Sequence, residues 1–177
     1  MAAYAAFLRG INVSGRRVKK EELITAFEAC GFDEVSTFRA SGNVLFEAPG
    51  RAKPDAKEIE SALEAELGFA SQVFIRSAAQ LAKVAGAKPF SPKQLSASKG
   101  KLQVAFLPKK PTKAKADKAL ALQLESDPLA LGAAELFWLP AAGTQESELE
   151  QKALYGLLGP WTMRTVGTVE QIAAKLC

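Results

Sequence analysis

Two glycine-marked turns in the first fifty residues constrain the fold of this chain more than any other feature. The first turn, residues 9–17, follows the apolar stretch 4–8, and the second turn, residues 39–43, precedes another apolar stretch. The only two asparagines of the chain, Asn12 and Asn43, lie in these turns. Glycine and asparagine adopt left-handed backbone conformations at little cost. The pattern predicts a strand that runs into a loop and, later, a loop that runs into a strand.

The rest of the first half supplies the elements that join these turns into one sheet. Leu23, Phe27 and Cys30 recur on one face of a helix predicted for residues 20–30, and Gly31 is typical of a helix end. Further strands are predicted at residues 2–9, 34–40, 44–48 and 72–76, and a second helix at residues 54–67 with Pro54 in its first turn. The order is βαββαβ, the ferredoxin-like pattern, in which residues 35–40 and 44–48 are antiparallel neighbours.

The second half repeats part of this pattern. Strands are predicted at residues 102–106, 136–139 and 161–164, and helices at residues 77–85, 112–124, 147–158 and 168–176. Ser147 and Thr168, each followed three positions later by Glu or Gln, predict the starts of the last two helices. Residues 86–100, rich in Pro, Ser and Lys, predict a connection. We therefore expect an α+β fold of two ferredoxin-like halves, residues 1–85 and 101–177, packed as one compact chain, the second a degraded unit.

The absence of histidine excludes several classes of site. Serine–histidine hydrolases, histidine general bases and imidazole metal ligands are impossible within one chain. The two cysteines, Cys30 and Cys177, form neither a zinc motif nor a disulfide framework, which favours a reducing cytoplasm. We expect Cys30 to be buried and unreactive. No apolar run reaches the roughly 20 residues of a membrane helix, so no membrane association is expected. No metal or cofactor is expected either, because the chain shows no motif for one.

Positive charge is unevenly distributed along the chain. Residues 1–20 carry a charge of +5 and no acid, and residues 88–118 carry nine lysines against Asp117 alone. The net charge is only +4, so the remaining residues are acidic. One interpretation is a basic face on an acidic body, and the other is that the lysines keep the surface solvated. Both interpretations stay open at this point.

Three motifs spread over the whole chain are informative together: Phe7–Gly15, Ser41–Phe46 and Thr162–Val169. On these motifs the chain resembles the domain-of-unknown-function 1697 family. Its members open with Leu-Arg-Gly-Ile-Asn-Val-Gly-Gly, continue with Ser-Gly-Asn-Val and close with Thr-Thr-Arg-Asn-Trp-Asn-Thr-Val. This chain departs at Ser14, where the family usually has glycine, and in the last motif, which lacks the Asn-Trp-Asn. The resemblance implies an α+β fold of two ferredoxin-like halves and implies no activity.

Nucleotide hydrolysis at the first turn is disfavoured. Gly10 and Gly15 have the glycine spacing of a phosphate-binding loop, but that motif continues with Lys and then Ser or Thr. Here Arg16 and Arg17 follow, so no hydroxyl is available for a magnesium ion. RNA recognition by stacking aromatics on the third strand is also disfavoured, because residues 43–47 contain one aromatic side chain. No acid–base pair stands out, and whether the protein is an enzyme is left open.

Arginines cluster around the two turns and favour recognition of an anion. Arg9, Arg16, Arg17 and Arg39 are four of the seven arginines, and arginine forks together with backbone N–H groups suit phosphate or carboxylate. The first and third strands of a ferredoxin-like sheet are antiparallel neighbours, so both turns are expected at one sheet edge. Arg164 precedes a predicted helix start, which also favours an anion. The candidate ligand-binding residues are Arg9, Asn12, Ser14, Gly15, Arg16, Arg17, Arg39, Ser41, Asn43, Arg164 and Thr168.

These residues predict an anion-binding module for a phosphorylated small molecule or a nucleic-acid backbone. The alternative is a purely structural role, in which the arginines pair with nearby glutamates or backbone carbonyls. A second function class is a protein–protein scaffold or homo-oligomer, because open ferredoxin-like sheets often pair. A pocket that joins both turns to Arg164 favours the ligand binder, whereas exposed apolar patches on a sheet face favour the scaffold.

Overall fold

The computed structural model describes residues 1–39, 42–50 and 53–177 of the chain. These residues form two compact units, the first Met1–Ala82 with Ile172–Cys177 and the second Lys83–Gln171. Two helices, α3 (Ala78–Gly86) and α7 (Val166–Leu176), contain residues of both units. Within the described ranges, no helix is both long and apolar enough to cross a membrane.

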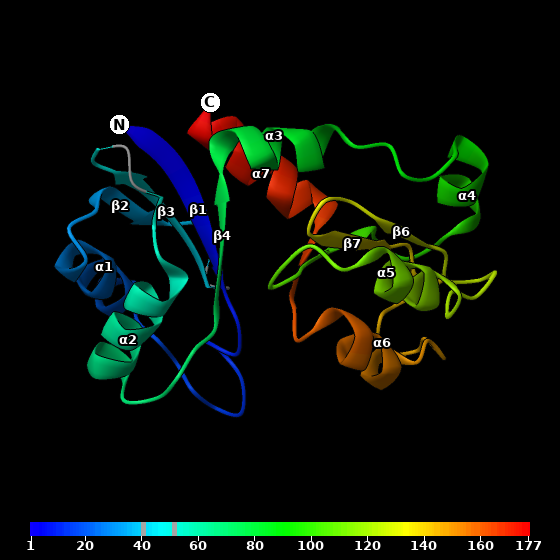
Figure 1. The fold of residues 1–177 in the computed structure, drawn as a ribbon, viewed down its shortest axis with the longest axis horizontal. Coiled ribbons are helices and arrows are strands. Elements are labelled where there is room, and N and C mark those ends of the chain that lie inside the picture. The colour runs from blue at the N-terminus through cyan, green and yellow to red at the C-terminus, as the bar shows by residue number, and fades with distance from the viewer. Residues whose placement is uncertain (40–41, 51–52) are drawn as a thin grey trace. The chain divides into compact units, whose positions relative to one another are not determined.

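The first unit has the predicted βαββαβ order (Figure 1). Its elements are β1 (Ala2–Leu8), α1 (Lys20–Ala29), β2 (Asp33–Thr37), β3 (Asn43–Ala48), α2 (Ala56–Leu67) and β4 (Val73–Ser77). The strands form one antiparallel sheet in the order β2-β3-β1-β4, which is the ferredoxin-like arrangement. The predicted pairing of β2 with β3 is confirmed, with Ser36 opposite Leu45 and Thr37 opposite Val44.

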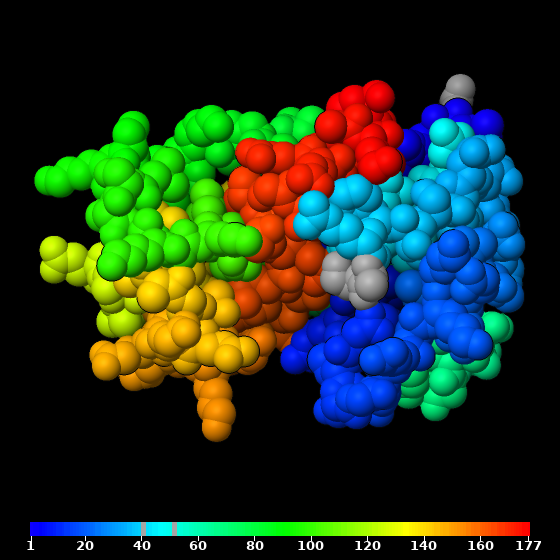
Figure 2. Space-filling view, turned by 180° about the vertical axis from the view of Figure 1, so that it is seen from behind, coloured from blue at the N-terminus to red at the C-terminus, as the bar shows by residue number. Residues whose placement is uncertain are grey.

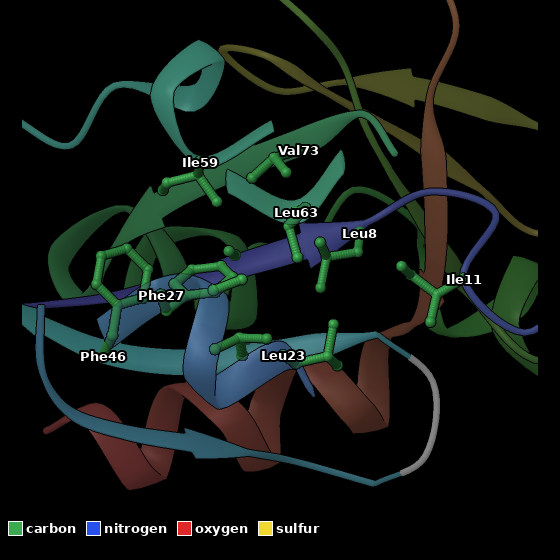
Figure 3. Packing of buried hydrophobic residues seen from close by; sticks show 11 residues of the cluster. Leu8, Ile11, Leu23, Phe27, Phe46, Ile59, Leu63 and Val73 are labelled. Atoms are coloured by element: carbon green, nitrogen blue, oxygen red, sulfur yellow. The ribbon is translucent and has the colours of Figure 1, made fainter. Parts of the chain in front are cut away.

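The predicted apolar faces of α1 and α2 form the core of this unit (Figure 3). Leu23 and Phe27 from α1 pack with Ile59 and Leu63 from α2 against the strands. Their partners on the sheet include Leu8 of β1, Phe46 of β3 and Val73 of β4. Ile11, only 3% exposed, joins the same cluster from the connection between β1 and α1. This one buried side chain therefore anchors a connection that is otherwise largely exposed.

Cys30 is half-buried beside this core, which corrects the expectation of full burial. Burial, and then the negative charge of Glu58, raise the pKa of the Cys30 thiol above its ordinary value. Less thiolate therefore forms at neutral pH. Cys177 is exposed at the chain end.

We expect a thiol reagent such as DTNB to label Cys177 faster than Cys30 in the native protein, by on the order of 10-fold at pH 7.5. The Cys177→Ser variant isolates the rate of Cys30, and the Cys30→Ser variant isolates that of Cys177. Labelling of both thiols should become equally fast in urea. Equal rates in the folded protein would contradict the raised pKa and the shielding of Cys30.

The second unit contains a strand that the sequence analysis missed (Figure 1). Its elements are α4 (Pro92–Ala97), β5 (Gln103–Phe106), α5 (Lys113–Leu120), β6 (Leu129–Leu131), β7 (Glu135–Trp138), α6 (Gln151–Leu158) and β8 (Thr162–Thr165). The strand order β6-β7-β5-β8 is antiparallel throughout. With β6 included, the unit has the complete βαββαβ pattern, so it is not degraded in topology. α4 lies inside the predicted connection, and its capping box of Ser91 and Gln94 was overlooked.

Three predicted helix boundaries in the second half of the chain are wrong, two of them because a predicted capping side chain forms a different hydrogen bond. The helix predicted from Ser147 begins at Gln151, since the Ser147 hydroxyl donates to the Asp127 carboxylate at 2.9 Å. α7 begins at Val166, and the Thr165 hydroxyl accepts the amide of Thr168 at 3.4 Å, so Thr168 lies within the helix. α5 ends at Leu120 rather than at residue 124, as turns follow it.

The boundaries of two elements of the first unit also differ from the prediction. α2 begins at Ala56, because the Asp55 carboxylate accepts the Lys57 amide at 2.9 Å and caps the helix. Pro54 therefore precedes α2 and does not form its first turn. β2 ends at Thr37, and Arg39 beyond it takes a left-handed φ of 56° that is incompatible with a strand.

The two units share one strand register although no sequence repeat is visible. Phe7 of β1 faces Asn43 and Phe74, and Phe106 of β5 faces Glu135 and Thr162 in the same way. The amide that follows each phenylalanine donates to the residue before the partner strand, Leu8 to Gly42 and Leu107 to Ala134. Each fourth strand carries an arginine, Arg76 or Arg164, that donates to the carbonyl of the residue before it. The second unit therefore repeats the first in backbone pairing.

Candidate anion-binding site

The connection between β1 and α1, residues 9–19, has a defined internal structure. Gly10, Ser14 and Gly15 take left-handed φ values of 71°, 55° and 79°. The Asn12 side-chain oxygen accepts the amide of Val18 at 3.3 Å, and the Arg16 amide donates to the carbonyl of Val13 at 3.1 Å. Asn12 therefore closes the loop on itself in front of α1.

The turn between β2 and β3 is held to β1. Gly42 has a left-handed φ of 72°, and its carbonyl accepts the amide of Leu8 at 2.8 Å. Asn43 is fully buried, and its side-chain amide donates to the carbonyl of Phe38 at 3.0 Å. The Phe38 amide donates back to the Asn43 carbonyl at 2.9 Å. Asn43 therefore closes the turn rather than facing solvent.

A cavity of about 250 Å³ lies where the two connections meet. It is lined by Ile11, Asn12, Val18, Lys20, Leu23, Thr37, Arg39 and Gly42. Figure 2 shows this face of the first unit, with the dark blue β1–α1 connection below the light blue end of β2. The turns converge as the sheet topology predicted, because β1 and β3 are antiparallel neighbours.

Among the described residues of the cavity wall, the two charged groups are cations, Lys20 and Arg39. Lys20 begins α1, and its ammonium lies 3.8 Å from the Glu21 carboxylate in a pair whose side chains are 70% and 66% exposed. Such an exposed pair holds the lysine weakly. The Arg39 guanidinium lies 5.5 Å from the centre of the Phe38 ring, and the Lys175 ammonium lies 5.7 Å from that ring centre. Arg39 therefore rests against an aromatic ring at the edge of the cavity.

Of the predicted site residues, Asn12 and Arg39 line this cavity. Arg16 instead lies over the ring of Phe69, with its guanidinium carbon 4.2 Å from the ring centre. The Arg9 backbone bonds to Gln72 and to the Ser71 hydroxyl at the start of β4. Ser14, Gly15 and Arg17 are exposed in the connection and outside the cavity wall, and Ser41 lies outside the described residues.

Arg164 and Thr168 lie in the second unit. Burial lowers the pKa of Arg164 to about 10, which leaves its guanidinium protonated at neutral pH. That guanidinium donates at 2.8 Å to the Thr162 hydroxyl and to the Met163 carbonyl. The Thr168 and Thr165 hydroxyls lie 3.0 Å apart and share a hydrogen bond. Thr168 therefore belongs to the start of α7 and not to the cavity of the first unit.

Six of the eight described lining residues were not among the predicted site residues: Ile11, Val18, Lys20, Leu23, Thr37 and Gly42. Lys20 was assigned only to a helix start, and Thr37 was assigned to the interior of a strand. Val18 carries no signal of its own beyond an apolar side chain ahead of the helix. The sequence offers one signal for these residues: they flank two turns that the element order predicts to lie side by side.

The described lining of the cavity suits binding of an anion. It offers two cations, the Asn12 amide and the Thr37 hydroxyl beside the apolar side chains of Ile11, Val18 and Leu23. Among the residues that the structure describes, no three His, Cys, Asp or Glu side chains gather to hold a metal ion. The described wall thus combines positive charge, polar side chains and an apolar side.

Comparisons with known proteins place this chain in a family. The sequence model of the family described as "Protein of unknown function (DUF1697)" matches residues 1–137. The solved structure of conserved bacterial protein SP0830 from Streptococcus pneumoniae is 20% identical in sequence, covers 99% of each chain and superposes with a TM-score of 0.69. That similarity supports the fold alone. No curated protein matches the chain.

Proposed function

The chain belongs to the DUF1697 family of proteins of unknown function, and on that premise we propose that it binds a small anionic molecule between its two glycine turns. The observation that carries this proposal is the cavity of about 250 Å³ with Lys20 and Arg39 in its wall. A phosphate or carboxylate group there meets two cations from different elements. Asn12 adds a polar side chain to the same wall.

The position of Arg39 supports this role. Its left-handed φ of 56° and its contact with the Phe38 ring direct a long side chain that would otherwise sample many rotamers. Ordering an arginine before the ligand arrives lowers the entropy cost of binding. A non-glycine residue in this backbone region is uncommon, and such residues are concentrated at functional sites.

The size and polarity of the cavity favour a small molecule over a polymer. Sites for drug-sized ligands measure roughly 300–1,000 Å³, and this cavity of about 250 Å³ lies below that range. Ile11, Val18 and Leu23 give it an apolar side, so the fitting ligand carries one anionic group on a short apolar body. A nucleic-acid backbone instead requires an extended basic surface.

The scaffold alternative finds less support. Among the described residues, the large hydrophobic side chains that are exposed are Met1, Val13 and Leu95, which lie in separate segments. Scattered apolar side chains of this kind are normal on a soluble surface. The second sheet face of the first unit, which includes Phe7, Leu45 and Phe74, is buried in the folded chain.

Arg39→Gln is expected to weaken binding of a small organic phosphate by about 10- to 100-fold, because one charge-assisted hydrogen bond contributes about 1.5–3 kcal/mol. Isothermal titration with propyl phosphate, phosphate and acetate measures this, after a thermal-shift screen that ranks the anions. Arg17→Gln removes the same charge outside the cavity wall and should leave affinity unchanged. Equal losses in both variants, or no thermal shift with any anion, would reject the site.

A further inference from the structure

The second unit carries a strongly polarised charge distribution of its own. Nine lysines and one acid, Asp117, lie in residues 88–118, whereas residues 119–171 hold seven acids and two cations. All nine lysines are exposed. Among these nine lysines as the structure describes them, Lys113 forms an ion pair: its ammonium lies 2.9 Å from the Asp117 carboxylate. Most of this positive charge is therefore directed at solvent.

The charge is densest between β5 and the first turn of α5, at Lys109, Lys110, Lys113 and Lys115, which we call the lysine connection. Stability of α5 does not explain these residues. The start of a helix carries a partial positive charge and prefers acids, and the first turn of α5 has none. The Thr112 hydroxyl already caps the helix by accepting the amide of Lys115 at 3.3 Å. Lysine ammonium groups here oppose the helix dipole.

The same connection of the first unit is also purely basic. Residues 9–20 carry Arg9, Arg16, Arg17, Lys19 and Lys20 and no acid. The common strand register makes the two connections equivalent, since each follows the first strand of its unit and leads into the helix that comes next, α1 or α5. Their sequences do not resemble each other, yet both lack carboxylates. Positive charge without carboxylates therefore occurs at the same position of the fold in both units.

We propose that the lysine connection is a docking surface for a nucleic-acid backbone. Lysines are mobile point charges that neutralise successive phosphates without reading bases, which suits sequence-independent binding. None of the large exposed hydrophobic side chains of the described residues lies between residues 108 and 118, so this surface offers no apolar anchor for a membrane. The inference is separate from the proposed small-anion cavity, which lies in the first unit.

The test compares two variants of the full chain with equal net charge. Lys109→Gln, Lys110→Gln, Lys115→Gln alters the lysine connection and spares Lys113, which pairs with Asp117 on α5. The control Lys53→Gln, Lys57→Gln, Lys83→Gln removes three exposed lysines elsewhere. Binding of a fluorescein-labelled 20-base-pair duplex is measured by anisotropy between 50 and 200 mM KCl. Circular dichroism and thermal melting confirm that both variants are folded.

Four phosphate contacts predict that the parent loses about 10²-fold in affinity over this salt range, and the lysine-connection variant only about 4-fold. The control should keep the salt dependence of the parent, and Arg39→Gln should not affect duplex binding. Three results would overturn the proposal: no duplex binding at 50 mM KCl, equal loss of salt dependence in both triple variants, or tighter binding to phosphatidylserine vesicles than to the duplex. The last result would assign the surface to an anionic membrane.

Discussion

Gly42→Val is expected to destabilise the protein by about 2–4 kcal/mol. A left-handed φ costs a side chain roughly 1–2 kcal/mol, more for a β-branched one, and forced contacts in a packed region add about 1–3 kcal/mol. Gly42 has a φ of 72°, and a Cβ there would lie 3.2 Å from the Leu8 Cβ and 3.3 Å from Ile11. Urea unfolding followed by circular dichroism measures the loss.

Gly31→Val is the matched control for this change. Gly31 has a similar φ of 79°, but a Cβ there would meet no atom within 4 Å. It should therefore lose only the backbone part, about 1–2 kcal/mol. Equal losses at Gly31 and Gly42 would show that the approach of the turn to Leu8 and Ile11 is looser than the structure indicates. A negligible loss at Gly42 would contradict its left-handed conformation as well.

Asp127→Ala is expected to cost about 3–5 kcal/mol, since it removes hydrogen bonds to a charged group and leaves a buried donor unsatisfied. The Asp127 carboxylate is 3% exposed and accepts from the Trp138 indole at 3.1 Å, the Ser147 hydroxyl at 2.9 Å and the Ser126 hydroxyl at 2.8 Å. Trp138 is 1% exposed, so its N–H gains no water in return. Urea unfolding monitored by tryptophan fluorescence measures the effect.

Two controls separate the contributions at Asp127. Ser126→Ala deletes the donor that is exposed and should cost less than about 1 kcal/mol. Trp138→Phe combined with Asp127→Ala should lose less than the sum of the single changes, because the orphaned indole donor is gone. Strict additivity of the two changes would show that the indole and the carboxylate do not interact. A loss below 1 kcal/mol for Asp127→Ala would contradict the buried network.

Elements whose signals are local were predictable from the sequence. α1 has its apolar spacing and a terminating glycine, and the β2–β3 pairing follows from a turn between two apolar stretches. β6 was missed because Leu129–Leu131 is short and lies in an apolar run without alternation. Ser147 was assigned to a helix start because the sequence does not show its hydrogen bond to Asp127, which lies 20 positions earlier. Tertiary hydrogen bonds overrode local capping signals in that case.

At the candidate site, the backbone arrangement was predictable from the sequence, but the positions of the side chains were not. That the two turns meet follows from the antiparallel pairing of β1 with β3, which the element order predicts. The element order does not predict which arginine lines the cavity. Arg16, for example, lies over the ring of Phe69, which follows α2. The burial of Asn43 was likewise hidden, because a turn asparagine and a strand-end asparagine look alike in sequence.

The shared register of the two units bears on how this chain tolerates change. The connection after the first strand spans residues 9–19 in the first unit and 107–112 in the second, yet Phe7 opposite Asn43 and Phe106 opposite Glu135 hold equivalent positions. Length variation at this position is thus absorbed outside the sheet. Insertions in these connections that leave the buried side chains Ile11 and Leu107 in place therefore need not shift the paired strands.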